Sequence, residues 1–219
     1  VDKMPRAGAA SELIKQVMGL FMLGAAVYFL GVGLVGIFQQ EGAPPSRAYL
    51  WIVAGCVAIA GLWLAWRTMR LATGAGTKVT FVGIGLLLAV SSIAVGNRLT
   101  DSGPIDWKYY TPELLESRLD TGDVVVLEFT AEWCLNCKLL EATVLNDPAV
   151  VEALEAEGVT PIKIDLTGNN VSGNALLNDL GGLRIPLLIV MTPSGEEVFR
   201  GDFYTIKQVV EAINQAKGQ

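Results

Sequence analysis

The chain has 219 residues, of which 52% are hydrophobic and 17% are charged. This composition is too apolar for one soluble globule and excludes a disordered chain. Up to Pro104 the chain has 8 Lys and Arg and 4 Asp and Glu, a net charge of +4. Beyond Pro104 it has 8 Lys and Arg and 18 Asp and Glu, a net charge of −10, and the two parts give the total of −6. The acidic second part has no basic stripe, which excludes nucleic acid as a partner. With 0 His residues, His-containing catalytic triads and His-ligated zinc or haem are excluded too.

Three apolar runs without a charged residue are long enough to cross the ~30 Å hydrocarbon core of a bilayer as helices. They cover residues 17–38, 49–66 and 79–96. We therefore expect a transmembrane region over residues 1–104. Lys and Arg cluster before the first run and between the second and third, which predicts that both of these segments are cytoplasmic. Everything after about Asn97 then lies outside the cytoplasm.

Cys56 lies in the middle of the second run. It is either a redox thiol within the membrane or a small residue that lets helices approach closely. The second interpretation is favoured, because the runs hold no other cysteine to complete a dithiol. Glycines in the runs also favour close packing against further helices.

Residues 105–219 are enough for one compact domain with its own core. Helical periodicity and strand-like apolar runs alternate, which predicts a small sheet covered by helices on both faces. Thr111 and Asp147 are the expected caps of two of these helices. The expected elements are helices at 111–119, 137–144, 147–157, 172–181 and 205–216, and strands at 123–131, 159–166, 185–191 and 197–201. The fold class is therefore a membrane α-helical segment followed by an α/β domain.

The run EFTAEWCLNCK, residues 128–138, concentrates the residues that carry chemistry. A strand that leads directly into Cys-x-x-Cys places Cys134 at a helix N-terminus, where unpaired N–H groups and the dipole favour a thiolate. Cys134 is thus the expected attacking sulfur, and Cys137, one turn further, is the expected buried partner that resolves a mixed disulfide. The alternative is half of a zinc site, but the sequence lacks the other half.

The stretch VVVLEFTAEWCLNCK, and Ile185-Pro186 ahead of LLIV, resemble the thioredoxin superfamily from Asp106 onward. The resemblance implies that the Ile185-Pro186 bond is cis, that Pro186 faces the cysteines and that the backbone around Ile185 pairs with a substrate peptide. The alternative is an ordinary trans proline at the start of a strand.

The resemblance further implies that Glu128 is a buried proton acceptor beneath Cys137. On the residues alone, a polar residue at a half-exposed strand position is the favoured interpretation of Glu128. Trp133 is expected to shape the surface beside Cys134 or, alternatively, to act as a hydrophobic cap. Leu135-Asn136 replaces the Gly-Pro of typical thioredoxins. Because these two residues help to set the redox potential, the resemblance does not fix its value.

Over its whole length the chain also resembles the C-terminal part of the DsbD family of membrane thiol:disulfide interchange proteins, in PRAGAASELIKQVMGLFMLGAAVYFLG and in WCLNCKLLEATVLNDPAVVEAL. The resemblance implies a relay in which cytoplasmic thioredoxin reduces an intramembrane cysteine pair. That pair reduces the outer Cys-x-x-Cys domain, which reduces periplasmic acceptor proteins. Cys56 alone does not replace the intramembrane pair. The upstream dithiol is therefore expected in a longer form of the protein or in another subunit.

These observations lead to the hypothesis of a protein-disulfide reductase in the bacterial inner membrane. Its helices would contact lipid, its C-terminal domain would lie in the periplasm, and it would need no metal or bound cofactor. Two alternatives stay open: a thiol oxidase or isomerase of the same fold, and a non-catalytic membrane-anchored binding module with a structural disulfide.

Overall fold

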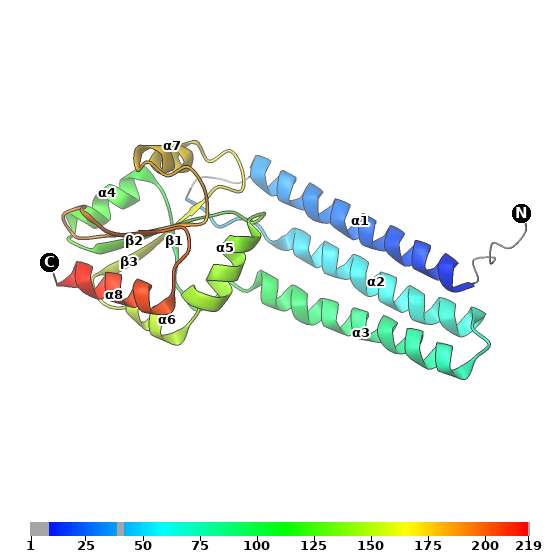
Figure 1. The fold of residues 1–219 in the computed structure, drawn as a ribbon. Helices are drawn as coiled ribbons and strands as arrows, with labels where there is room; N and C mark the ends of the chain where they lie inside the picture. The colour runs from blue at the N-terminus through cyan, green and yellow to red at the C-terminus, as the bar shows by residue number, and fades with distance from the viewer. Residues whose placement is uncertain (1–8, 39–41, 219) are drawn as a thin grey trace, which may run out of the picture. The chain divides into compact units, whose positions relative to one another are not determined.

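The computed structural model describes residues 9–38 and 42–218 (Figure 1). The described residues of 1–31 and 46–101 form one compact unit, and those of 32–45 and 102–219 form a second.

Three long helices begin the chain: α1 (Ala9–Phe38), α2 (Ala48–Leu71) and α3 (Ala75–Thr100). Each is long and apolar enough to cross a membrane, with mean hydropathies of 2.2, 2.0 and 2.2. The helices extend beyond the charge-free runs, because α2 continues through Arg67 and Arg70, and α3 begins before Lys78. Long basic side chains near a helix end can reach the polar interface, so a charge does not end the helix.

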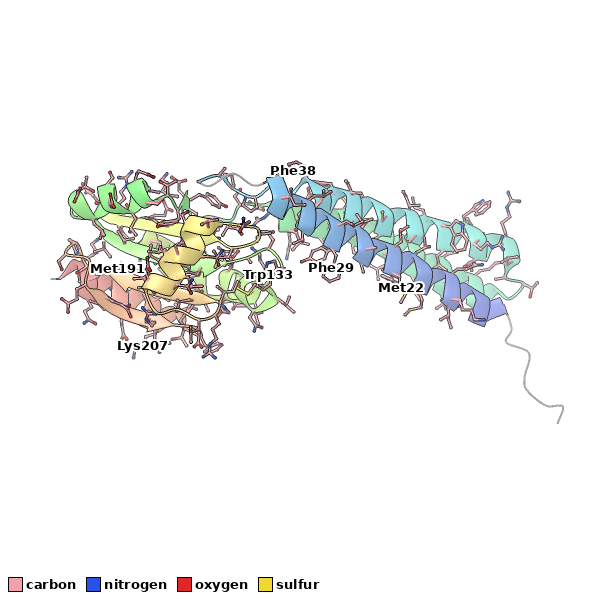
Figure 2. All side chains as sticks on the ribbon, turned by 90° about the horizontal axis from the view of Figure 1, so that it is seen from above. Met22, Phe29, Phe38, Trp133, Met191 and Lys207 are labelled. Carbon is pink, nitrogen blue, oxygen red and sulfur yellow. A yellow bond between two sulfur atoms is a disulfide. The ribbon has the colours of Figure 1, made fainter. Side chains whose placement is uncertain are left out.

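Close contact between α2 and α3 depends on two glycines. A Cβ atom added at Gly61 would lie 2.4 Å from the carbonyl oxygen of Gly85, and one added at Gly85 would lie 2.4 Å from that of Gly61. Many large apolar side chains of the helices are exposed, among them Met22 and Phe29 on α1 (Figure 2). Outward apolar side chains are what a helix needs in contact with lipid.

A mixed five-stranded sheet in the order β1-β3-β2-β4-β5 forms the centre of the second unit. The strand β2 pairs in parallel with β3 and antiparallel with β4. Figure 1 shows α4 and α7 on one side of the sheet and α6 and α8 on the other. The strands are β1 (Lys108–Tyr109), β2 (Val124–Thr130), β3 (Val159–Asp165), β4 (Leu187–Met191) and β5 (Glu197–Gly201). The helices are α4 (Pro112–Asp120), α5 (Leu135–Leu140), the π-helix η1 (Glu141–Leu145), α6 (Pro148–Leu154), α7 (Val171–Asp179) and α8 (Ile206–Lys217).

The central strand β2 separates two apolar cores, and all seven of its residues are buried. Val124 and Val126 pack with residues of α6 and α8. Val125, Leu127 and Phe129 face the opposite side and pack with residues of α4 and α7. This alternation fixes the side of the sheet to which each β2 residue points, because neighbouring side chains of a strand point to opposite faces.

The expected fold class is confirmed: three long apolar helices are followed by an α/β domain. The expected caps are also present, because Thr111 accepts from the Leu114 N–H and Asp147 from the Ala149 N–H. Two elements were missed. The strand β1 is too short to give a pattern, with two residues paired to β3. The helix expected at 137–144 begins earlier, at Leu135, and changes at Glu141 into the π-helix η1.

Candidate thiol–disulfide site

A disulfide joins Cys134 and Cys137 at the start of α5, with their Cα atoms 5.3 Å apart. Cys134 is the N-cap of α5, and its sulfur accepts a hydrogen bond from the Cys137 backbone N–H at 3.3 Å. Unpaired N–H groups and the helix dipole stabilise negative charge at this position. After reduction, Cys134 is therefore the sulfur whose thiolate the backbone stabilises.

The two cysteines differ in their access to solvent. Cys134 is 7% exposed and Cys137 is 1% exposed. Both lie in a small apolar cluster with Ala131, and Ile185 packs against this cluster. A partner can reach Cys134 more readily than Cys137.

The segment before β4 contains the expected cis peptide bond, between Ile185 and Pro186. Both residues are half-buried, and the contact of Ile185 with the cysteine cluster brings this segment to the redox pair. Trp133 precedes Cys134 and is 53% exposed (Figure 2). Trp133 therefore offers apolar surface beside the disulfide.

Glu128 lies on β2 and is 2% exposed, so the half-exposed position considered from the sequence is wrong. Its neighbour across the parallel pair of strands is Lys163 on β3. The Lys163 Nζ lies 3.1 Å from the Glu128 Oε2. Burial raises the pKa of Glu128 to about 7, although Lys163 lowers it in part. A carboxyl with this pKa can exchange a proton near neutral pH.

Further charged side chains connect Glu128 to the helix that carries the cysteines. Glu141, on η1, lies 3.5 Å from Lys163 and 3.3 Å from Lys138, the residue after Cys137. Lys138 also pairs with Glu132 at 3.0 Å. Burial alone would raise the pKa of Glu141, but Lys163 and Lys138 outweigh it, and the pKa is lowered. Glu141 is thus an anion that shares Lys163 with Glu128.

Sequence reasoning missed Lys163, Lys138, Glu141 and Glu132. A signal for Lys163 was present, because a lysine between Ile162 and Ile164 in an apolar strand must find a buried counter-charge. The π-helix gave no sequence signal, and it is the element that carries Glu141. Cys56 is a free, half-buried cysteine of α2.

Comparison with known proteins finds similar sequences over the α/β domain and over most of the chain. A thioredoxin-like family model matches residues 106–193. The thiol:disulfide interchange protein DsbD of Pseudomonas fluorescens is 27% identical over 89% of the chain and 35% of its own length. DsbD of Neisseria meningitidis serogroup A is 26% identical over 88% of the chain and 34% of its own length.

Among solved structures, the oxidised C-terminal domain of Neisseria meningitidis DsbD is 29% identical, with a TM-score of 0.41, covering 49% of this chain and 97% of that one. The chain spans about a third of the length of the curated relatives it matches. Residues 106–193 are thus similar to a thioredoxin-like family, and the chain resembles the C-terminal part of DsbD-type thiol:disulfide interchange proteins over most of its length.

Proposed function

We propose that this chain is a protein-disulfide reductase that passes electrons to other proteins by thiol–disulfide exchange at Cys134 and Cys137. The observation that carries the proposal is the disulfide at the N-terminus of α5, with the Cys134 sulfur held by the Cys137 N–H. The names of the relatives support the same class of chemistry.

In the first step the reduced chain meets a partner that carries a disulfide. The Cys134 thiolate attacks one partner sulfur, the partner S–S bond breaks, and the other partner sulfur leaves as a thiolate. The product is a mixed disulfide between Cys134 and the partner. The N–H groups at the start of α5 favour this step, because they raise the thiolate fraction of Cys134.

In the second step Cys137 loses its proton and attacks the Cys134 sulfur. The mixed disulfide breaks, the partner leaves as a dithiol carrying two electrons, and the Cys134–Cys137 disulfide forms again. Glu128 takes the Cys137 proton, directly or through one water. This role requires a base with a pKa near the working pH, and the buried Glu128 carboxyl has a pKa of about 7.

Partner docking involves the exposed ring of Trp133 and the segment of Ile185 and Pro186. This segment precedes β4 and contacts the cysteine cluster through Ile185. An extended partner peptide can pair with its backbone, which brings the partner sulfur to Cys134. Trp133 then supplies apolar contact area beside the attacking sulfur.

The proposed setting is the bacterial inner membrane. Residues 1–104 form the membrane region, and residues 105–219 form a periplasmic domain whose electron acceptors are periplasmic thiol–disulfide proteins. The oxidised Cys134–Cys137 pair is reduced again by an upstream intramembrane dithiol, supplied by a longer form of the protein or by another subunit. The periplasmic placement of residues 105–219 is supported by the excess of Lys and Arg before residue 17 and over residues 67–78, which favours the cytoplasmic side for both segments.

The test compares Cys137→Ser and Cys134→Ser in the full chain, purified in detergent and mixed with a disulfide-bonded protein substrate. The Cys137→Ser variant should accumulate a mixed disulfide, visible on a non-reducing gel, because the second step is blocked. The Cys134→Ser variant should form none. Equal trapping by both variants would contradict the assigned roles. Absence of exchange in the parent would favour a structural disulfide.

A further inference from the structure

The ring of Trp107 lies over the ammonium group of Lys163, whose Nζ is 4.7 Å from the ring centre. Trp107 precedes β1, which pairs in parallel with β3, so that Tyr109 is the register partner of Lys163. The Trp107 ring also packs against the apolar core beneath α6 and α8. Its position is therefore fixed by both the sheet and the core.

Lys163 needs such a neighbour because it is charged and only 6% exposed. Its charge is balanced by the carboxylates of Glu128 at 3.1 Å and Glu141 at 3.5 Å. Tyr109 faces it from β1, and Lys138 on α5 competes with it for Glu141.

The face of an aromatic ring carries negative charge density and attracts a cation, most strongly where water is excluded. The ring of Trp107 thus stabilises the ammonium where it stands and covers it from solvent. Without the ring, the flexible Lys163 side chain would be held less strongly in the buried position between two carboxylates. Glu128 would then lose part of the positive charge that stabilises its ionised form.

We propose that Trp107 is a positioning residue that holds the Lys163 ammonium against Glu128 and Glu141, and so sets the pH range in which Glu128 accepts the Cys137 proton. The inference rests on the proposed function, since it assumes that Glu128 is that acceptor. In this role Trp107 acts through Lys163 and not on the cysteines.

The second exchange step can be timed in the full chain, in detergent, with Cys56→Ala present so that only the site cysteines react. The reduced protein is mixed with an aromatic disulfide reagent that releases a coloured thiolate. Attack by Cys134 releases the first thiolate and leaves a mixed disulfide. Attack by Cys137 on the Cys134 sulfur then releases the second, while the Cys137 proton goes to Glu128. The rate of this second release is measured against pH.

In Trp107→Leu the midpoint of this pH profile should move to higher pH by about half a unit to one unit, which corresponds to the strength of a partly buried cation–π contact. Trp107→Phe keeps an aromatic face and should show less than half of the shift. In the Lys163→Met background, Trp107→Leu should produce no further shift. Val151→Ala is the matched control, because Val151 packs against the same core as Trp107 and lies on α6.

Three results would overturn the inference. One is an unchanged midpoint in Trp107→Leu, and another is a shift to lower pH, which would mean that entry of water dominates. The third is an equal shift in the Lys163→Met background or in Val151→Ala, because the ring would then act through general stability. If Glu128→Gln leaves the pH profile of the parent unaltered, Glu128 is not the proton acceptor. This result refutes the proposed role of Glu128 without any change at Trp107, so the two failures are distinguishable.

Discussion

Replacement of Glu128 by Gln should make the α/β domain more stable at alkaline pH and change its stability little in acid. The reason is the burial of Glu128, which raises its pKa from 4.5 to about 7. Below pH 4.5 the carboxyl is protonated in the folded and the unfolded state, so its ionisation costs nothing. As pH rises through 4.5 and up to about 7, the unfolded state loses the proton first, and the folded state becomes less stable.

The magnitude follows from the size of the pKa shift. At 1.36 kcal/mol for each pKa unit, Glu128 should cost about 3 kcal/mol at about pH 8 and about 1 kcal/mol at about pH 5. Gln does not ionise, so this cost is absent from the variant at both pH values. The stabilisation by Glu128→Gln should therefore be about 2 kcal/mol larger at about pH 8 than at about pH 5. Contributions that do not depend on pH cancel from this difference.

Hydrogen exchange of β2 peptides in the full chain measures this difference, because buried amides of a central strand exchange through unfolding of the domain. The measurement compares the parent and Glu128→Gln at both pH values after correction for intrinsic exchange rates. Glu152→Gln, at an exposed position of α6, is the control for removal of one negative charge. An equal pH dependence of stability in the parent and in Glu128→Gln would refute the reasoning.

Gly61→Val should disrupt the contact between α2 and α3, because its side chain would meet the Gly85 carbonyl. Gly83→Val is the control, since it has open space around it and should leave the contact intact. Cross-linking between engineered cysteines on the two helices would detect the loss. Thr205→Ala removes a capping box of α8 and should cost about 1 kcal/mol of stability, measured by hydrogen exchange of α8. Trp133→Ala should slow electron transfer to a protein disulfide and leave reduction of the chain by dithiothreitol nearly unchanged, and equal slowing of both reactions would contradict its docking role.

The sequence predicted those parts of the domain that depend on local pattern. Cys134, Thr111 and Asp147 are helix caps as expected, because an N-cap depends on residues within one turn. The cis bond before Pro186 was expected from the resemblance to thioredoxins and is present. The boundary near residue 104 and the catalytic roles of the site residues stay predictions.

The charged neighbours of Glu128 could not be predicted in the same way, because they depend on strand register and on one irregular helix. Lys163 lies beside Glu128 only because β2 and β3 pair in parallel in this register, and a shift of one residue would turn it to the other face of the sheet. Glu141 reaches Lys163 from a π-helix, whose hydrogen bond from the Asn146 N–H to the Glu141 carbonyl has no sequence signature.

The reduction potential of the Cys134–Cys137 pair tests the proposed direction of electron flow most directly. The full chain carrying Cys56→Ala, in detergent, is equilibrated against glutathione and then against dithiothreitol, and the free thiols are alkylated and counted. A reversible potential near or below about −200 mV is expected of a reductase that supplies periplasmic partners. A value near about −120 mV would instead indicate an oxidase. A bond that neither couple opens would contradict both and leave a structural disulfide.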